Sequence, residues 1–350
     1  MKRVMIDELE EGMCISQDVL TESGAFVMPR DTLVTNAIIK RLDTYHIPFV
    51  YIDDNNGFQF ENIKDTDEFK EFQKTYDDVT DSMQNSFSDI ITRNADDSKV
   101  RGLIDKGYDF YKQSGDKSNV LDMLHAMREY SDSTFLHSLN VAMIASIIAK
   151  WLKWSEKDEE TVFTAGLFHD IGKLLIPPEI LHKPGKLSDD EYAIMKTHPI
   201  RGLEILKDYH LSSDILRGVV EHHERFDGSG YPFGKKGTDI NRFARVLAIS
   251  DVYDAMTATR VYRGPVCPFD VISIFESEGL HYYDTEYVLT FISNVMETYM
   301  HSKVILSNGQ NAEIIMINKT MRSRPLVVTD HGKFIDLAHV KDIRIDSIVG

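Results

Sequence analysis

The chain has 350 residues, of which 42% are hydrophobic, 10% aromatic and 27% charged. This composition is typical of globular proteins and excludes disordered, collagenous and disulfide-scaffold classes. Lys and Arg number 39 against 56 Asp and Glu, and the resulting net charge of −17 argues against a nucleic acid polymer or an anionic membrane as partner.

Two cysteines, Cys14 and Cys267, are too few for a thiolate metal knuckle or a disulfide framework. Any metal site must therefore use nitrogen and oxygen ligands, and the expected location is a reducing, cytoplasmic compartment. The first residues turn acidic before an apolar segment can form, and the longest apolar stretch, residues 141–149, is shorter than the ~18 residues that span a bilayer. We therefore expect no membrane insertion.

Residues 1–60 are predicted to form a small α+β module of unknown role. Short apolar bursts are separated by Gly12, Gly24, Pro29 and Pro48, which is typical of strands and turns. Between them, residues 34–45 place apolar side chains on one helical face.

Residues 61–120 are predicted to be a helical linker. Between Phe69 and Ile90, apolar residues recur every three or four positions with acids and amides between them, which predicts a long amphipathic helix. Two interpretations remain open. The helix packs on the rest of its own chain, or it is one half of a seam that joins two chains in a homodimer.

Residues 121–301 contain several helix-length apolar patterns, including residues 134–152 and 159–175, with little strand alternation. From residue 302 to 350 the pattern changes to short strands with turns at Asn308-Gly309 and His331-Gly332. The predicted fold class is therefore mainly α, with a small α+β module before the helices and a short β-unit after them.

Histidines and aspartates cluster in the helical segment. His169 and Asp170 are adjacent, His222 and His223 are adjacent, and three further candidates lie in apolar helical sequence: His137, His198 and Asp251. Imidazole with carboxylate and no thiolate suits iron, manganese, zinc or nickel. A single buried histidine is more often a hydrogen-bonded core residue, but the two adjacent pairs weaken that interpretation.

Adjacent residues point about 100° apart on a helix, so His169 and Asp170 reach metals only if these lie between helices. This favours a helical bundle around a multinuclear centre in which Asp170 bridges two ions. Two ions about 4 Å apart form the clamp used for displacement at phosphorus. Lys173 is predicted to share the helix face of His169 and Asp170 and to stabilise a phosphate oxygen or the leaving group.

The order of these motifs resembles one family. The segment HDIGKLLIPPEILHKPGKL, then HHERFDGSGYPFG, then ISDVYDAMTATRVYR, is similar to the HD-GYP domain, a group of HD metal-dependent phosphohydrolases that degrade cyclic di-GMP. The resemblance covers residues 123–299. It implies a helical-bundle HD-type catalytic domain that hydrolyses cyclic di-GMP by means of a hydroxide bridging two metals. The expected product is pGpG, with further cleavage to GMP left open.

The resemblance also implies roles for individual residues. Lys173 and Asp170 are catalytic. The implied substrate-binding residues are Arg260 and Arg263, which contact the phosphates of the ligand, and Gly230, Tyr231 and Pro232, which lie on the loop that shapes the site. The implied metal ligands are His137, His169, Asp170, His198, His222, His223 and Asp251. Iron is the first expectation for the two divalent ions, with manganese or zinc as alternatives.

One position departs from the pattern. Some family members hold a third metal through a Glu four residues before the first His, where this chain has Ser133, and Asp132 is one residue out of phase. We therefore expect two metals. The rival functions are hydrolysis of another cyclic dinucleotide or nucleotide, because the metal centre does not read the base, and a catalytically silent cyclic di-GMP receptor.

Overall fold

The computed structural model divides the chain into two compact units. The first comprises Met1–Asn62, Tyr299–Thr320 and Arg324–Gly350, and the second comprises Ile63–Thr298 and Met321–Ser323. The structure describes residues 2–6, 9, 13–21, 26–28, 32–34, 36–45, 47–52, 66–114, 120–127, 134–257 and 266–349. All of the predicted metal ligands belong to the second unit.

The N-terminal part of the first unit is an α+β module, as expected. An antiparallel sheet has the strand order β1-β6-β2-β5, and β3 pairs with β4. Its core includes Ile15, Leu42 and Val50. The elements are β1 (Lys2–Met5), β2 (Cys14–Ile15), β3 (Val19–Leu20), β4 (Phe26–Met28), β5 (Thr32–Leu33), α1 (Asn36–Thr44) and β6 (Phe49–Ile52).

The C-terminal part is an antiparallel five-stranded sheet with the order β10-β9-β8-β7-β11. The Asn308-Gly309 and His331-Gly332 turns join β7 to β8 and β9 to β10, which confirms the predicted β-unit. The strands are β7 (Lys303–Leu306), β8 (Asn311–Met316), β9 (Leu326–Thr329), β10 (Phe334–Asp336) and β11 (Ile345–Val349).

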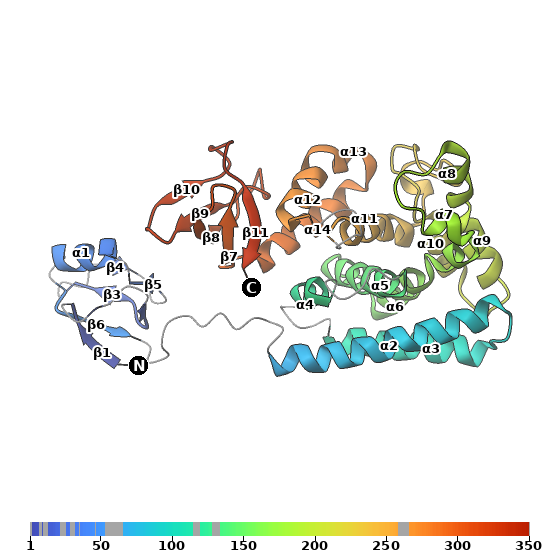
Figure 1. Ribbon diagram of the computed structural model, residues 1–350, viewed down its shortest axis with the longest axis horizontal. Coiled ribbons are helices and arrows are strands. Elements are labelled where there is room, and N and C mark those ends of the chain that lie inside the picture. Colours follow the sequence, from blue (N-terminus) through green and yellow to red (C-terminus); the bar gives the residue numbers. More distant parts are fainter. Residues whose placement is uncertain are drawn as a thin grey trace. The chain divides into compact units, whose positions relative to one another are not determined.

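The second unit is helical, which confirms the predicted fold class (Figure 1). It begins with α2 (Asp67–Ile91), α3 (Asp97–Ser114), α4 (Val120–Met127), α5 (Thr134–Trp151), α6 (Glu156–Phe168) and the 3-10 turn η3 (Ile171–Leu175). It continues with α7 (Pro178–Leu181), α8 (Asp189–Met195), α9 (His198–Leu206), α10 (Ser213–Glu221) and η4 (Gly237–Asp239). The last elements are α11 (Arg242–Thr257), α12 (Pro268–Ile274), the π-helical turn η5 (Phe275–Gly279), α13 (Leu280–Tyr282) and α14 (Thr285–Thr298).

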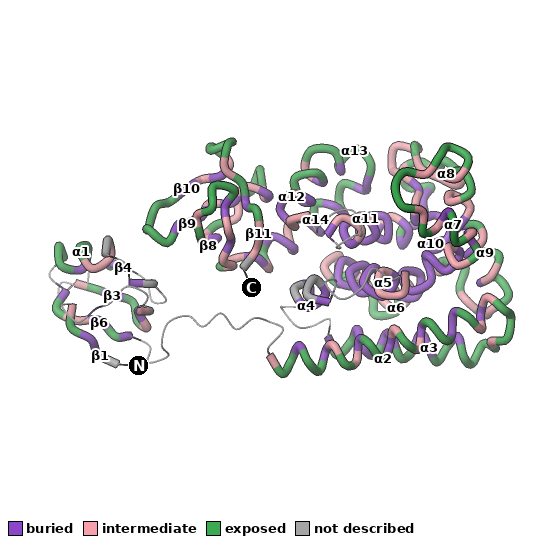
Figure 2. The backbone as a smooth tube through the Cα atoms, in the orientation of Figure 1, coloured by how far each residue is buried: buried purple, intermediate pink, exposed green. Residues whose placement is uncertain are grey.

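Helix α5 is the central helix of this unit. Every residue from Ser138 to Ala149 is buried, and α6 and α11 pack against it (Figure 2). By length and composition α5 could cross a membrane, but 67% of it is buried inside the structure. A helix that is apolar on all sides is the form expected for the core of such a bundle.

The helix predicted over residues 159–175 is shorter than expected. Helix α6 ends at Phe168, and the chain turns at His169 and Asp170 before η3 begins. The physical reason lies at Gly172, where a Cβ atom would come within 2.0 Å of the carbonyl oxygen of His198. This backbone contact with the start of α9 draws the chain out of the α6 direction and into the bundle.

The apolar stripe on α2 is buried within the second unit. Its members pack against α3 and α5, and Phe87 stacks on Phe168 with ring centroids 5.4 Å apart. The phenol of Tyr76 donates to Oδ1 of Asn140 on α5 at 2.6 Å. The structure thus favours the first interpretation, since α2 and α3 are part of the helical unit rather than a separate linker. A homodimer through this helix would have to use a different face.

Shortening Met83 tests this packing. Met83 on α2 is 0% exposed, so Met83→Ala should lower the free energy of unfolding by about 2–5 kcal/mol through the cavity that it leaves. Gln84→Ala, one residue further along and exposed, is the matched control and should change little. Chemical denaturation at two protein concentrations measures both. A loss for Met83→Ala that depended on concentration would instead place the stripe between two chains.

Candidate metal centre

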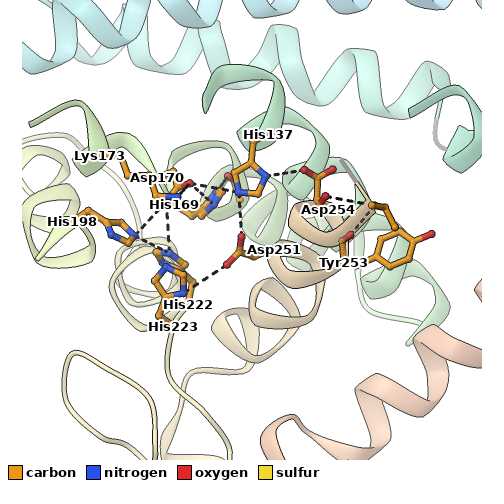
Figure 3. A network of polar contacts seen from close by, with 12 residues as sticks. His137, His169, Asp170, Lys173, His198, His222, His223, Asp251, Tyr253 and Asp254 are labelled. Carbon is orange, nitrogen blue, oxygen red and sulfur yellow. Dashed lines mark hydrogen bonds and ion pairs between the residues drawn. The ribbon is translucent and has the colours of Figure 1, made fainter. Parts of the chain in front are cut away.

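The seven predicted metal ligands converge in the second unit (Figure 3). Their ligand atoms form two groups, and within each group the atoms lie within 4.8 Å of one another. The first group is Asp170, His198, His222 and His223, and the second is His137, His169 and Asp251. Helices α5, α9 and α11 and the turns after α6 and α10 supply these side chains. The structure therefore brings together every predicted ligand.

Three of the histidines have a defined tautomer. In each, Nδ1 contacts the backbone carbonyl oxygen three residues earlier, and a carbonyl oxygen can only accept a hydrogen bond. The pairs are His169 with Gly166 at 2.7 Å, His198 with Met195 at 2.9 Å and His222 with Val219 at 2.6 Å. Nδ1 therefore carries a proton, and Nε2 of each ring is left to present a lone pair to the centre.

These lone pairs face one another. Nε2 of His198 lies 3.3 Å from Nε2 of His222, and 3.3 Å from Oδ1 of Asp170 without hydrogen-bond geometry. Nε2 of His169 and Oδ1 of Asp170 are buried and have no hydrogen-bond partner within the part of the chain that the structure describes. Burial lowers the pKa of His222 well below its usual range, so this ring stays neutral. A cluster of acceptors without donors fits a divalent cation.

Asp170 lies between the two groups. Its Oδ1 faces His198 and His222, while Oδ2 is 3.2 Å from Nε2 of His169 and 3.5 Å from Nε2 of His137. Burial raises the pKa of Asp170, but the interactions with His169 and Lys173 outweigh this effect and hold the pKa well below the usual range. Asp170 is therefore an ionised carboxylate with one oxygen available to each group.

His137 is held by two carboxylates of α11. Its Nε2 lies 3.1 Å from Oδ1 of Asp251, and its Nδ1 lies 2.7 Å from Oδ2 of the buried Asp254. Burial lowers the pKa of His137, but the hydrogen bonds to Asp251 and Asp254 raise it to about 10. Asp254 orients the ring in the way that carboxylates support metal-bound histidines. Our sequence analysis missed Asp254, although its position three residues after Asp251 places both on one helix face.

Lys173 reaches the centre from η3. Its Nζ lies 2.5 Å from Oδ2 of Asp170, and its side chain is 24% exposed. Lys173 was predicted to share a helix face with Asp170, and the two side chains do meet. Lys173, however, reaches Asp170 from a 3-10 turn and not from a continued α-helix. The ammonium group therefore lies at the edge of the centre, where solvent and a substrate have access.

The Gly-Tyr-Pro segment packs directly against the ligands. A Cβ atom on Gly230 would lie 2.3 Å from the backbone nitrogen of Arg225, so only glycine fits. The ring of Tyr231 packs against that of His223 at an angle of 33°, with centroids 4.7 Å apart, and the Tyr231-Pro232 peptide is cis. The buried carboxylate of Glu224 accepts hydrogen bonds from the backbone nitrogens of Phe233 and Lys235 at 2.7 and 3.0 Å.

Glu224 was also missed by the sequence analysis, in which it was only the third letter of the HHE motif. Its contacts fix the segment after Pro232 to the end of α10. Four other positions of the sequence analysis, Asp132, Ser133, Arg260 and Arg263, lie outside the described residues.

Comparisons with known proteins agree with this geometry. A family model described as HD domain matches residues 112–287, half of the chain. A solved structure, an HDG"Y"P protein from Bdellovibrio bacteriovorus, superposes with a TM-score of 0.54 at 16% identity, covering 85% of this chain and 99% of the other. The likeness to this structure concerns the fold.

Several curated proteins are similar to this chain in sequence. A 3'3'-cGAMP-specific phosphodiesterase of Vibrio cholerae is 36% identical over 173 residues, which is 48% of this chain and 40% of the relative. A cyclic di-GMP phosphodiesterase of Pseudomonas aeruginosa is 39% identical over 146 residues, 41% and 35% of the two chains. A probable cyclic di-GMP phosphodiesterase of V. cholerae is 30% identical over 278 residues, which is 71% of this chain and 62% of the relative. The chain thus spans less than two thirds of the length of these relatives.

Removing the charge of Asp254 tests its positioning role. Asp254→Asn should weaken metal binding about 10- to 100-fold, because an amide supports the His137 ring less well than a carboxylate does. The measurement is competition for metal against a chelator of known affinity. Asp190→Asn, an exposed carboxylate on α8, is the control. Unchanged affinity in Asp254→Asn would contradict the assigned role.

Proposed function

The chain belongs to the HD domain family, and on this premise we propose that it is a metal-dependent phosphodiesterase that hydrolyses cyclic di-GMP to pGpG. The observation that carries the proposal is Asp170, a buried carboxylate whose two oxygens face two separate groups of histidine and aspartate ligands. Such an arrangement suits two ions placed for displacement at phosphorus. The relatives named as cyclic di-GMP phosphodiesterases support this choice of substrate.

The two ligand groups define how metal would be held. Asp170, His198, His222 and His223 would hold one ion, while His137, His169 and Asp251, with the second oxygen of Asp170, would hold the other. When bound, such ions neutralise phosphate oxygens and lower the pKa of a water molecule to give a nucleophile near neutral pH. The imidazole and carboxylate set suits iron, manganese or zinc, and the family resemblance makes iron the first expectation.

The residues of the chain supply orientation and charge. Asp170 remains ionised because His169 and Lys173 lie next to it, so it can bridge the two groups. The ammonium group of Lys173 is placed to stabilise the negative charge that develops on phosphate oxygens. Arg260 and Arg263 would contact the phosphates of the substrate, as the family resemblance implies.

The sequence likeness to a 3'3'-cGAMP-specific phosphodiesterase favours a second candidate substrate, because the ligand set itself does not distinguish bases. A silent receptor is disfavoured. Binding alone requires neither a complete buried donor set nor a lysine at 2.5 Å from the bridging carboxylate.

Two substitutions separate a ligand from a group that stabilises the transition state. Asp170→Asn should lose metal and nearly all turnover of cyclic di-GMP, because a neutral amide is a poor bridge between cations. Lys173→Ala should keep the metal and lower kcat about 100- to 1000-fold. Elemental analysis and chromatography of the products measure both effects. Lys157→Ala, an exposed lysine on α6, is the control. A fully active Asp170→Asn protein would place the chemistry elsewhere.

The metal count is a further test. We expect two ions per chain in protein purified anaerobically, one for each ligand group, and loss of turnover on chelation with recovery on adding iron or manganese. Three ions per chain would show that a carboxylate beyond the two groups takes part. Metal-replete protein that binds cyclic di-GMP without cleaving it would support the receptor alternative.

A further inference from the structure

A pocket of about 280 Å³ adjoins the metal centre, and the ring of His223 belongs to both. Its other walls come from three places in the second unit: α8, residues 225–231 in the loop after α10, and the end of α13 with the residue that follows it. They include Tyr192, Arg225, Ser229, Tyr231, Tyr282 and Tyr283. The proposed phosphodiester chemistry assigns no role to this concentration of tyrosines around one arginine.

The tyrosines of the pocket offer flat aromatic rings that differ in their exposure to solvent. Tyr192 is 49% exposed and Tyr282 38% exposed, whereas Tyr283 is 8% exposed at the base. Burial raises the pKa of Tyr231 and of Tyr283, so both phenols stay neutral. Exposed aromatic rings beside a buried floor are the surfaces on which nucleic acid bases stack.

Arg225 supplies the directional group. Its guanidinium carbon lies 4.8 Å from the centroid of the Tyr283 ring, which holds it in place. Its Nη1 is buried and has no hydrogen-bond acceptor among the described residues. A guanidinium only donates hydrogen bonds, and a buried N–H without an acceptor is unfavourable. A ligand atom that accepts hydrogen bonds would correct this deficit.

We propose that the pocket is a base subsite that holds one guanine, stacked on tyrosine, with Arg225 donating to O6 and N7 of its Hoogsteen edge. The inference rests on the proposed function, since it places the base of the same cyclic dinucleotide whose phosphate lies at the metal centre. Arginine pairs with guanine in this way because both atoms accept hydrogen bonds. Adenine keeps N7 but presents an amino donor in place of O6, so one of the two guanidinium donors would be left without an acceptor.

The assignment makes a specific statement about substrates. The pocket binds one base and requires that base to be guanine. Cyclic di-GMP and the mixed dinucleotide 3'3'-cGAMP both supply a guanine, while cyclic di-AMP does not. Stacking on the tyrosines tolerates either purine, because every base has an aromatic face. Selectivity should therefore depend on Arg225, and overall affinity on the exposed tyrosines.

Equilibrium binding of the three dinucleotides tests the proposal. Full-length, metal-loaded Lys173→Ala protein is used so that hydrolysis does not deplete the ligand. Cyclic di-AMP should bind about 10- to 100-fold more weakly than cyclic di-GMP. Adding Arg225→Met, which keeps an apolar stem against Tyr283, should remove most of this preference. Arg101→Met, an exposed arginine on α3, is the matched control and should retain it.

A second variant keeps the test valid if Arg225→Met proves unstable. Tyr282→Ala should weaken cyclic di-GMP and cyclic di-AMP by a similar factor of about 5 to 50, since stacking does not distinguish purines. Equal affinity of the parent protein for the two ligands, unchanged selectivity in a folded Arg225→Met protein, or no loss in Tyr282→Ala would each overturn the subsite. Guanine-selective binding by a wild-type protein that shows no turnover would overturn the proposed hydrolysis and leave the subsite standing.

Discussion

Asp170 is a carboxylate with 0% exposure inside a helical bundle, and much of the helical unit is arranged around it. Burying such a charge is costly unless opposite charges and donors surround it. Lys173 supplies one positive charge at 2.5 Å. The neighbouring imidazoles, by contrast, turn lone pairs toward it, so the carboxylate and the rings together form a site that only cations can complete.

The helix ends explain how the imidazoles keep that orientation. The carbonyl groups in the last turn of a helix have no partner within the helix. His169 follows α6, His222 follows α10 and His198 lies shortly after α8, and in each case Nδ1 binds a carbonyl oxygen of that helix end. The hydrogen bond from Nδ1 thus gives a carbonyl oxygen of the helix end a donor, and it also fixes the tautomer in which Nε2 carries no proton. The same three residues are helix-terminating groups and ligands.

Much of this arrangement is predictable from the sequence because its signals are local. Adjacent ligand pairs, the three- and four-residue spacing along α2 and the Asn-Gly turn of the β-unit each depend on near neighbours. The end of α6 at Phe168 is different. It depends on Gly172 meeting the backbone of His198, a contact between residues far apart in sequence that no periodicity reveals. Asp254 escaped notice for a related reason, since its partner His137 lies 117 positions earlier.

The residues that would bind metal and the residues that would recognise the base lie in adjacent but different places. The ligand groups contain only imidazoles and carboxylates, which bind a metal phosphate complex without regard to the attached base. Recognition must therefore come from the walls next to the centre, and His223 belongs to both, with Tyr231 packed against its ring. Glu224 fixes the backbone after Pro232, and Gly230 lets that segment approach within a distance that no side chain would permit. The Gly-Tyr-Pro segment thus sets the spacing between the proposed base pocket and the metal ligands, so metal binding and base recognition depend on the same short stretch of backbone.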